Sequence, residues 1–290
     1  MKVDWLFSMS TQDPILVKKI QSLGPNVKVE GFANTHLIHV LEDDPAFNEI
    51  RSIFEQAKNT EACVIESCTI SYSEKERLSA KWLRIRSMYD GVDNGHDDWG
   101  ISYANKHASG RKHVILGKES TKEIYEHTIQ IAPLQTTVVP KWRANRQFCT
   151  DLYSGISLCC SDVAKRVIEE SRMTGAKFCP VLSASTRIPL PNVWQICPKE
   201  CENFLAPGPY INTSTCRVCG QTLYSHKIIG RGELRIQEDR IPKGLDFMQT
   251  PPLVNGRPFY VISQRAYQVL KEAQITRALV FEPLSGTGDG

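Results

Sequence analysis

The sequence lacks the apolar runs that a membrane-spanning helix needs. No stretch of about 18 apolar residues occurs, so we expect no membrane span. The amino-terminal residues include Asp4 and contain no apolar core of a signal peptide, so we expect no secretion. The 10 cysteines are then expected in a reducing, cytoplasmic environment, where paired thiols bind metal more readily than they form disulfides.

Several catalytic signatures are also missing. The chain contains no GxSxG nucleophile elbow, no HExxH motif, no Walker phosphate loop and no GxGxxG dinucleotide fingerprint. The net charge of +3 is small and gives no general attraction to nucleic acid or acidic membranes. With 41% hydrophobic and 23% charged residues, the 290-residue chain has an ordinary globular composition and is long enough for two domains.

The most recognisable chemistry lies in a cysteine-rich stretch, residues 194–220. It holds a CxxxC pair and then a CxxC pair followed by glycine: Cys197 and Cys201, then Cys216 and Cys219 with Gly220. A CxxCG turn is typical of a zinc knuckle, because its two sulfurs project to one point. Four thiolates form the tetrahedral set that structural Zn²⁺ prefers. The sequence therefore predicts a structural zinc site with these four cysteines as ligands, in an insertion over residues 194–230.

Other interpretations of the cysteines stay open. The CxxxC spacing is looser than CxxC, so the four residues are alternatively ordinary thiols. His226 follows Cys219 closely, and an imidazole replaces one thiolate in some zinc sites. Cys159 and Cys160 lie beside an expected helix start, a position that can activate a thiol, but their apolar neighbours favour packing. Four further cysteines are expected in the core: Cys63, Cys68, Cys149 and Cys179.

The first 73 residues predict six elements in the order strand, helix, strand, strand, helix, strand. Asp13-Pro14 and Asp44-Pro45 each supply an N-cap followed by a proline that starts a helix. Apolar residues then recur at helical spacing: Ile15, Leu16, Ile20 and Leu23, and later Phe47, Ile50, Ile53 and Phe54. The strands are expected at residues 5–7, 27–32, 36–41 and 62–71. This order predicts a ferredoxin-like βαββαβ unit over residues 1–73.

Residues 74–146 form a connecting region with weaker signals. A short helix is expected after Ser73, and residues 83–85 return to a strand pattern. The acidic stretch 90–98 resembles a calcium loop but lacks the closing glutamate, which favours a solvated turn. The basic residues within 106–113 have no interleaved aromatic residues, so we expect a solvated loop there.

Two similar segments flank the cysteine-rich insertion, at residues 158–181 and 261–284. Placing Ser161 over Ser263 aligns two apolar stripes at helical spacing, and each serine is a candidate N-cap. Further residues coincide in this alignment: Met173 with Ile275, Thr174 with Thr276 and, after one inserted residue, Pro180 with Pro283. We expect two related strand–helix–strand units in a C-terminal α+β domain over residues 147–290.

These motifs resemble those of the bacterial double-CxxCG proteins, a group that includes immunity proteins of contact-dependent and polymorphic toxin systems. The resemblance covers about residues 147–284. Its motifs are the segment 161–181, the Cys216–Gly220 knuckle, the Asp246-Phe247 pair and the segment 263–283. The chain departs from the family pattern in that it has one CxxCG only, and the other pair is the CPKEC of Cys197 and Cys201.

The resemblance implies a non-enzymatic cytoplasmic protein that binds and neutralises a cognate toxin. This task needs a rigid complementary surface, and a structural zinc ion orders a loop that buries little apolar area. We therefore expect a protein partner, no membrane association and no role for nucleic acid. Two alternatives remain open: an enzyme that uses a zinc-bound or free cysteine, and a zinc-containing nucleic-acid-binding protein.

Overall fold

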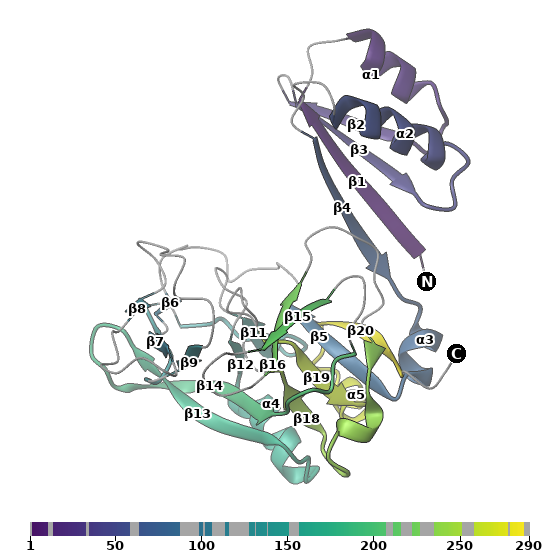
Figure 1. Cartoon of the computed structure of the whole chain (residues 1–290). Helices are drawn as coiled ribbons and strands as arrows, with labels where there is room; N and C mark the ends of the chain where they lie inside the picture. The colour runs from purple at the N-terminus through teal and green to yellow at the C-terminus, as the bar shows by residue number, and fades with distance from the viewer. Residues whose placement is uncertain are drawn as a thin grey trace. The chain divides into compact units, whose positions relative to one another are not determined.

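The protein is a mixed α+β structure with many strands and few helices. Its computed structural model describes residues 2–10, 14–32, 35–58, 64–87, 99–100, 102–105, 114–115, 128–130, 132–137, 139–150, 157–206, 211–215, 222–226, 235–250, 258–277 and 279–286. The chain forms two compact units, one spanning Met1–Glu76 and the other most of the remainder (Figure 1). Within the described ranges, no helix is long and apolar enough to cross a membrane.

The first unit contains six elements in the order that the sequence predicts. They are β1 (Lys2–Ser10), α1 (Pro14–Gln21), β2 (Lys28–Phe32), β3 (Thr35–Leu41), α2 (Phe47–Lys58) and β4 (Val64–Ser71). The four strands form an antiparallel sheet in the order β2-β3-β1-β4. Strand β1 is longer than the sequence predicts, because as a central strand it pairs along its whole length with β3 and β4.

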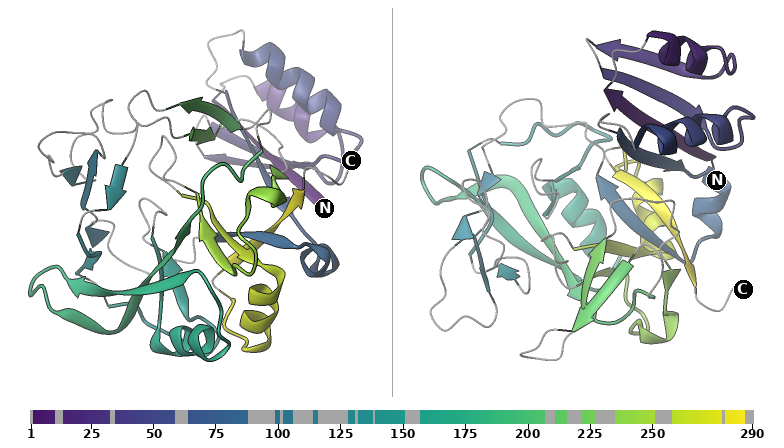
Figure 2. Two further views of the ribbon diagram at one scale, coloured as in Figure 1. Left: turned by 60° about the horizontal axis from the view of Figure 1, so that its bottom comes forward. Right: turned by 45° about the horizontal axis from the view of Figure 1, so that its top comes forward.

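Both helices of this unit cover the same face of its sheet (Figure 2). Alternate residues of β1 point toward them, and these are buried together with the apolar stripes of the helices: Val3, Trp5, Phe7, Met9, Ile20, Phe47, Ile50, Ile53 and Phe54. Ile15 lies outside the stripe and is 76% exposed. The stripe runs through Leu16 and Ile20, and a neighbouring residue on a helix is rotated by about 100° away from it.

The second unit is built on a large mixed sheet. Its described strands are β5 (Trp82–Ser87), β6 (Trp99–Gly100), β7 (Ser102–Asn105), β8 (Val114–Ile115), β9 (Thr128–Gln130), β10 (Gln135–Thr136), β11 (Phe148–Thr150), β12 (Leu158–Cys160), β13 (Ala176–Ser183), β14 (Pro189–Glu200), β15 (Ile211–Thr215), β16 (Thr222–His226), β17 (Arg235–Ile236), β18 (Phe247–Gln249), β19 (Tyr260–Ser263) and β20 (Leu279–Gly286). Its helices are α4 (Asp162–Glu170) and α5 (Gln264–Glu272), with a 3-10 turn at Glu238–Arg240; α3 (Glu74–Ser79), the short helix expected after Ser73, lies at the boundary between the units. The main sheet runs β17-β20-β5-β19-β18-β14-β13-β10-β6, and β12 joins β11 to β14.

Two segments that the sequence assigns to other regions are strands of this sheet. Strand β5, from the predicted connecting region, pairs with both β19 and β20. Trp194 to Glu200, assigned to the cysteine-rich insertion, form the end of β14. They are strand residues because apolar side chains such as Val193 and Ile196 alternate between the two faces of the sheet. The insertion therefore begins inside the sheet.

The two related strand–helix–strand segments are both present, as β12-α4-β13 and β19-α5-β20. The hydroxyls of Ser161 and Ser263 accept hydrogen bonds from the amides of Ala164 and Ala266, which confirms both predicted N-caps. The two helices also end alike. Arg172 and Gln274 have φ of 50° and 56°, the left-handed conformation that closes a helix.

The structural repeat is larger than the sequence repeat. Each copy has a preceding strand and a central strand, giving the orders β11-β12-β14-β13 and β18-β19-β5-β20. We call these repeat 1 and repeat 2. The ladders match in register up to Pro180 and Pro283, which pair with Trp194 and Leu83, and these two central-strand residues also pair with Cys160 and Ile262. Beyond Pro180 the β13–β14 ladder shifts register, whereas the β20–β5 ladder continues to Leu284 and Trp82.

The core lies between this double sheet and the two helices. Buried residues of α4 and α5, such as Ile168 and Leu270, pack with strand residues from both repeats in one cluster. The opposite face carries two smaller clusters, one around Cys159 and Val193 in repeat 1 and one around Val261 in repeat 2. The helix-free face is therefore packed separately in each repeat.

Candidate functional site

The predicted zinc ligands fall partly within the described chain. Cys216 and Cys219 lie outside the described residues, so the four-thiolate site stays a prediction. Cys197 lies in β14, and Cys201 directly follows that strand. His226, the alternative ligand, ends β16, where its backbone pairs with Ile211.

Cys197 contacts another cysteine that the sequence analysis assigns only to the core. Its sulfur lies 3.6 Å from the sulfur of Cys179 on the neighbouring strand β13. Burial, together with the nearby Cys179, raises the pKa of the Cys197 thiol to about 12, while Lys177 acts in the opposite direction. Without a bound cation, the Cys197 sulfur is therefore a protonated thiol at neutral pH.

Cys201 lies in different surroundings. It is buried among apolar side chains that include Phe204 and Met248. Because β14 is extended up to Glu200, Cys201 is carried roughly 13 Å along the chain from Cys197 at about 3.3 Å per residue. Each cysteine side chain bridges only about 3 Å of that separation, so the structure does not bring these two sulfurs to one point.

The other candidate thiols are enclosed. Cys159 and Cys160 are both fully buried. Desolvation raises the pKa of Cys160 well above its ordinary value, and the charge of Cys149 acts in the same direction. A raised pKa lowers the thiolate fraction, which is opposite to what a nucleophilic cysteine needs. In the chain segments that the structure describes, no three His, Cys, Asp or Glu side chains gather in a metal-binding group.

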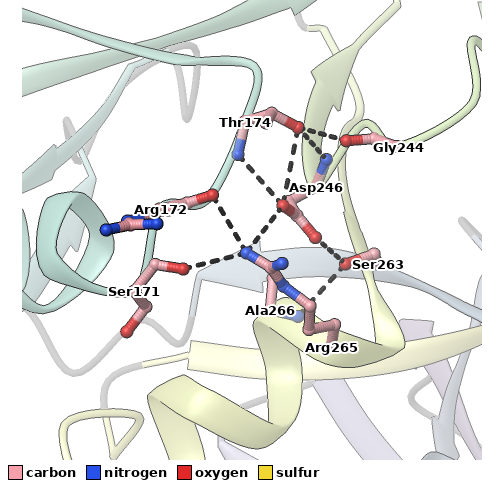
Figure 3. A network of polar contacts seen from close by, with 8 residues as sticks. All are labelled: Ser171, Arg172, Thr174, Gly244, Asp246, Ser263, Arg265 and Ala266. Atoms are coloured by element: carbon pink, nitrogen blue, oxygen red, sulfur yellow. Dashed lines mark hydrogen bonds and ion pairs between the residues drawn. The ribbon is translucent and has the colours of Figure 1, made fainter.

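A polar network joins the two repeats around the buried Asp246 (Figure 3). One carboxylate oxygen accepts a hydrogen bond of 2.7 Å from the Ser263 hydroxyl. The other accepts one of 3.0 Å from the backbone amide of Thr174 and lies 3.4 Å from the Arg265 guanidinium. Arg265 also donates to the carbonyl oxygens of Ser171 and Arg172, which follow α4. Both oxygens of Asp246 are thus engaged by the protein itself.

The turn that contacts Asp246 requires a glycine. Gly175 has φ of 86°, and a Cβ atom there would lie 2.1 Å from the carbonyl oxygen of Phe247. The amides of Asp246 and Phe247 both donate to the carbonyl oxygen of Thr174. The Thr-Gly and Asp-Phe motifs that contribute to the family resemblance therefore contact each other.

The reciprocal contact exists on the other side of the junction. Thr276 of repeat 2, the counterpart of Thr174, forms a bridge with Arg146, and the amide of Arg277 donates to Asn145. Gln147, which follows Arg146, accepts two hydrogen bonds from Ser161: one from the hydroxyl to its side chain and one from the amide to its carbonyl oxygen. Asp246 accepts the same two hydrogen bonds from Ser263. Each repeat thus places its helix-exit turn against the strand entry of the other, an approximate two-fold arrangement.

The central positions of the two repeats hold different polar groups. In repeat 2, Arg84 forms an ion pair of 3.2 Å with Glu282, and its guanidinium lies 4.0 Å from the ring centroid of Phe259. In repeat 1, Gln195 takes the place of Arg84 and donates to Ser157 over 3.2 Å. Cys179 occupies the position of Glu282. The backbone is shared, but the polar side chains on its helix-free face are not.

Sequence reasoning missed the contact of Cys179 with Cys197 and the equivalence of Gln147 in repeat 1 to Asp246 in repeat 2. The latter was hidden by unequal loops, since Gln147 lies 14 residues before Ser161 and Asp246 lies 17 before Ser263. The only signal for Cys179 was the alignment of Pro180 with Pro283, which does not reveal what lies on the next strand.

Comparison with known proteins adds no assignment: no protein-family model matches the chain, and no curated protein matches it.

Proposed function

We propose that the chain is a non-enzymatic, zinc-stabilised interaction protein of the cytoplasm, an immunity protein that binds and neutralises a cognate bacterial toxin. The observation that carries the proposal is that the polar residues of the shared motifs bond to one another. Asp246 accepts hydrogen bonds from both Thr174 and Ser263. A catalytic carboxylate must be reached by its substrate, whereas Asp246 is buried with both oxygens bonded to the protein, which fixes the elements as a docking scaffold needs.

The enclosed thiols support the same proposal over a cysteine enzyme. Cys159 and Cys160 are buried, and burial raises the pKa of Cys160. A thiol used as a nucleophile is activated by a base or a positive charge that lowers its pKa. The surroundings of Cys160 act in the opposite sense.

The first unit fits an interaction protein equally well. Its element order and its β2-β3-β1-β4 antiparallel sheet support a ferredoxin-like unit. Such units host many functions, so the fold alone assigns none.

The proposal is tested with the product of the neighbouring gene, which an immunity role requires to be a toxin. Co-expression of the intact chain is expected to restore growth to cells that produce the toxin, and the two proteins should elute together in size-exclusion chromatography. The matched control is a catalytically inactive toxin, which should still co-elute. Unchanged killing combined with separate elution of the two proteins would overturn the proposal.

A further inference from the structure

Two sulfur atoms on neighbouring strands of repeat 1 lie close together. Cys179 on β13 and Cys197 on β14 have their sulfurs 3.6 Å apart. In the ladder, Cys179 lies opposite Gln195 and Cys197 lies opposite Lys177, so the two cysteines are diagonal neighbours on the same face of the sheet. This places them on the helix-free face, away from α4.

The separation suits a shared metal ion better than a disulfide. Tetrahedral zinc with bonds of about 2.3 Å to each sulfur holds its sulfurs about 3.8 Å apart. A disulfide needs about 2.05 Å between sulfurs and Cα atoms within about 7 Å. Diagonal neighbours have Cα atoms about 7–8 Å apart, at the outer limit of that range. An ion would therefore enter the thiol pair with little movement, whereas a disulfide needs the strands to shift.

Repeat 2 serves as an internal control for this pair. Its register puts Glu282 at the position of Cys179 and Arg86 at the position of Cys197. The same strands thus form without either thiol. The four strands of a repeat therefore pack without cysteines at these two positions, and the pair is a specific feature of repeat 1.

We propose that Cys179 and Cys197, rather than Cys197 and Cys201, bind the zinc ion as a pair of thiolate ligands. Cys201 fails the same geometric requirement, because the extended end of β14 separates it from Cys197 and apolar side chains enclose it. Lys177, directly opposite Cys197, supplies a positive charge beside the pair. The inference rests on the zinc-stabilised part of the proposed function and is independent of toxin recognition.

Cobalt substitution tests the ligand assignment on the full chain. Co²⁺ takes the place of Zn²⁺, and its visible and ultraviolet absorption reports the number of bound thiolates. Cys179→Ser and Cys197→Ser are each expected to shift the spectrum to fewer sulfurs and to weaken zinc binding by at least about 10-fold in competition with a chromophoric chelator. Cys201→Ser should leave both unchanged. Cys149→Ser is the matched control, a half-buried thiol in the same half-sheet.

A second measurement needs no substitution and so does not depend on variant folding. Zinc should slow alkylation of Cys179 and Cys197 by at least about 10-fold, as read by peptide mass mapping of the native protein. Equal alkylation of Cys179 with and without zinc overturns the inference, as does a spectrum that responds to Cys201→Ser but not to Cys179→Ser. Failure to bind zinc at all overturns the zinc part of the proposed function as well. Zinc binding through Cys179 without toxin protection overturns only the immunity role.

Discussion

Repeat 1 and repeat 2 place different side chains at the same point of the same backbone. One has Gln195 bonded to Ser157 beside a pair of thiols, and the other has Arg84 paired with Glu282 over an aromatic ring. Both repeats share the features that fix the backbone: the serine N-caps, the left-handed helix ends and the apolar residues under the helices. The fold is therefore encoded by caps and apolar alternation, and the polar layer is free to differ.

The junction also differs in charge between the two repeats. Repeat 2 contributes a buried carboxylate, Asp246, where repeat 1 contributes the neutral Gln147. The carboxylate gathers an arginine and two amide or hydroxyl donors, while Gln147 binds Ser161 and the carbonyl oxygen of Arg143. We expect the Asp246 side of the junction to be the stronger one, because hydrogen bonds to a charged acceptor are worth roughly twice as much as neutral ones.

The largest effect should follow from breaking the close approach at the junction. Gly175→Ala combines a φ of 86° with a Cβ atom 2.1 Å from a backbone oxygen, so β18 must move away from the turn. We expect a loss of about 4 kcal/mol in unfolding free energy, measured by chemical denaturation. Gly244→Ala is the control, since its φ of 73° strains the backbone but its Cβ meets nothing within 4 Å. That change should cost only about 1 kcal/mol, and equal losses would contradict the contact.

Replacing the polar residues at the centre of repeat 2 by those of repeat 1 tests whether the same backbone accepts either set of side chains. Glu282→Cys alone leaves the half-buried Arg84 without its carboxylate and should cost about 3 kcal/mol. Adding Arg84→Gln should recover part of the loss, with a coupling of about 1–2 kcal/mol in a double-mutant cycle of unfolding free energies. Additive losses would show that the ion pair does not couple and that the two centres are not equivalent.

Replacing Asp246 and Gln147 by alanine, one at a time, tests whether the two sides of the junction differ in strength. Asp246→Ala leaves the Thr174 amide and the Ser263 hydroxyl without their acceptor and should cost about 2–3 kcal/mol in unfolding free energy. Gln147→Ala removes neutral hydrogen bonds only and should cost about 1 kcal/mol. If the glutamine change proved the more costly of the two, the expected ranking of the two sides would be wrong.

The helix caps should give the smallest and most even pair of effects. Ser161→Ala and Ser263→Ala each remove one hydroxyl acceptor from a helix amide, at 3.3 Å and 3.1 Å respectively. We expect about 1 kcal/mol for each, by thermal or chemical denaturation. Threonine at either position keeps the acceptor and should restore most of the loss. A large difference between the two serines would mean that one acts chiefly through its junction partner.

Local signals made much of this structure predictable. The predicted start at Pro14 is confirmed, because α1 begins at that residue. The second helix begins at Phe47 and not at Pro45, and the Asp44 carboxylate accepts the Ala46 amide in the turn before it. The serine caps and the element order of the first unit follow from spacing over a few residues, which the sequence displays directly. Ile15 is an error of one residue in where the apolar stripe of α1 begins.

Long-range pairing was not predictable in the same way. Nothing near β5 states that it will lie between β19 and β20, because register depends on partners far along the chain. For the same reason the sequence suggests Cys201, a neighbour along the chain, as the partner of Cys197 and gives no sign of Cys179, its diagonal neighbour on the adjacent strand. Periodicity identifies strands, but only tertiary packing selects which strands meet.

The placement of β5 has a consequence for biosynthesis. Arg84 and its partner Glu282 are 198 residues apart. At typical translation speeds, β5 waits on the order of 10–40 s after its own synthesis before both flanking strands have been made. During that interval its two edges are open to other nascent chains, and its apolar residues Leu83 and Ile85 have no sheet to enter. Repeat 2 closes last, and a holdase that shields β5 should raise the yield of native protein.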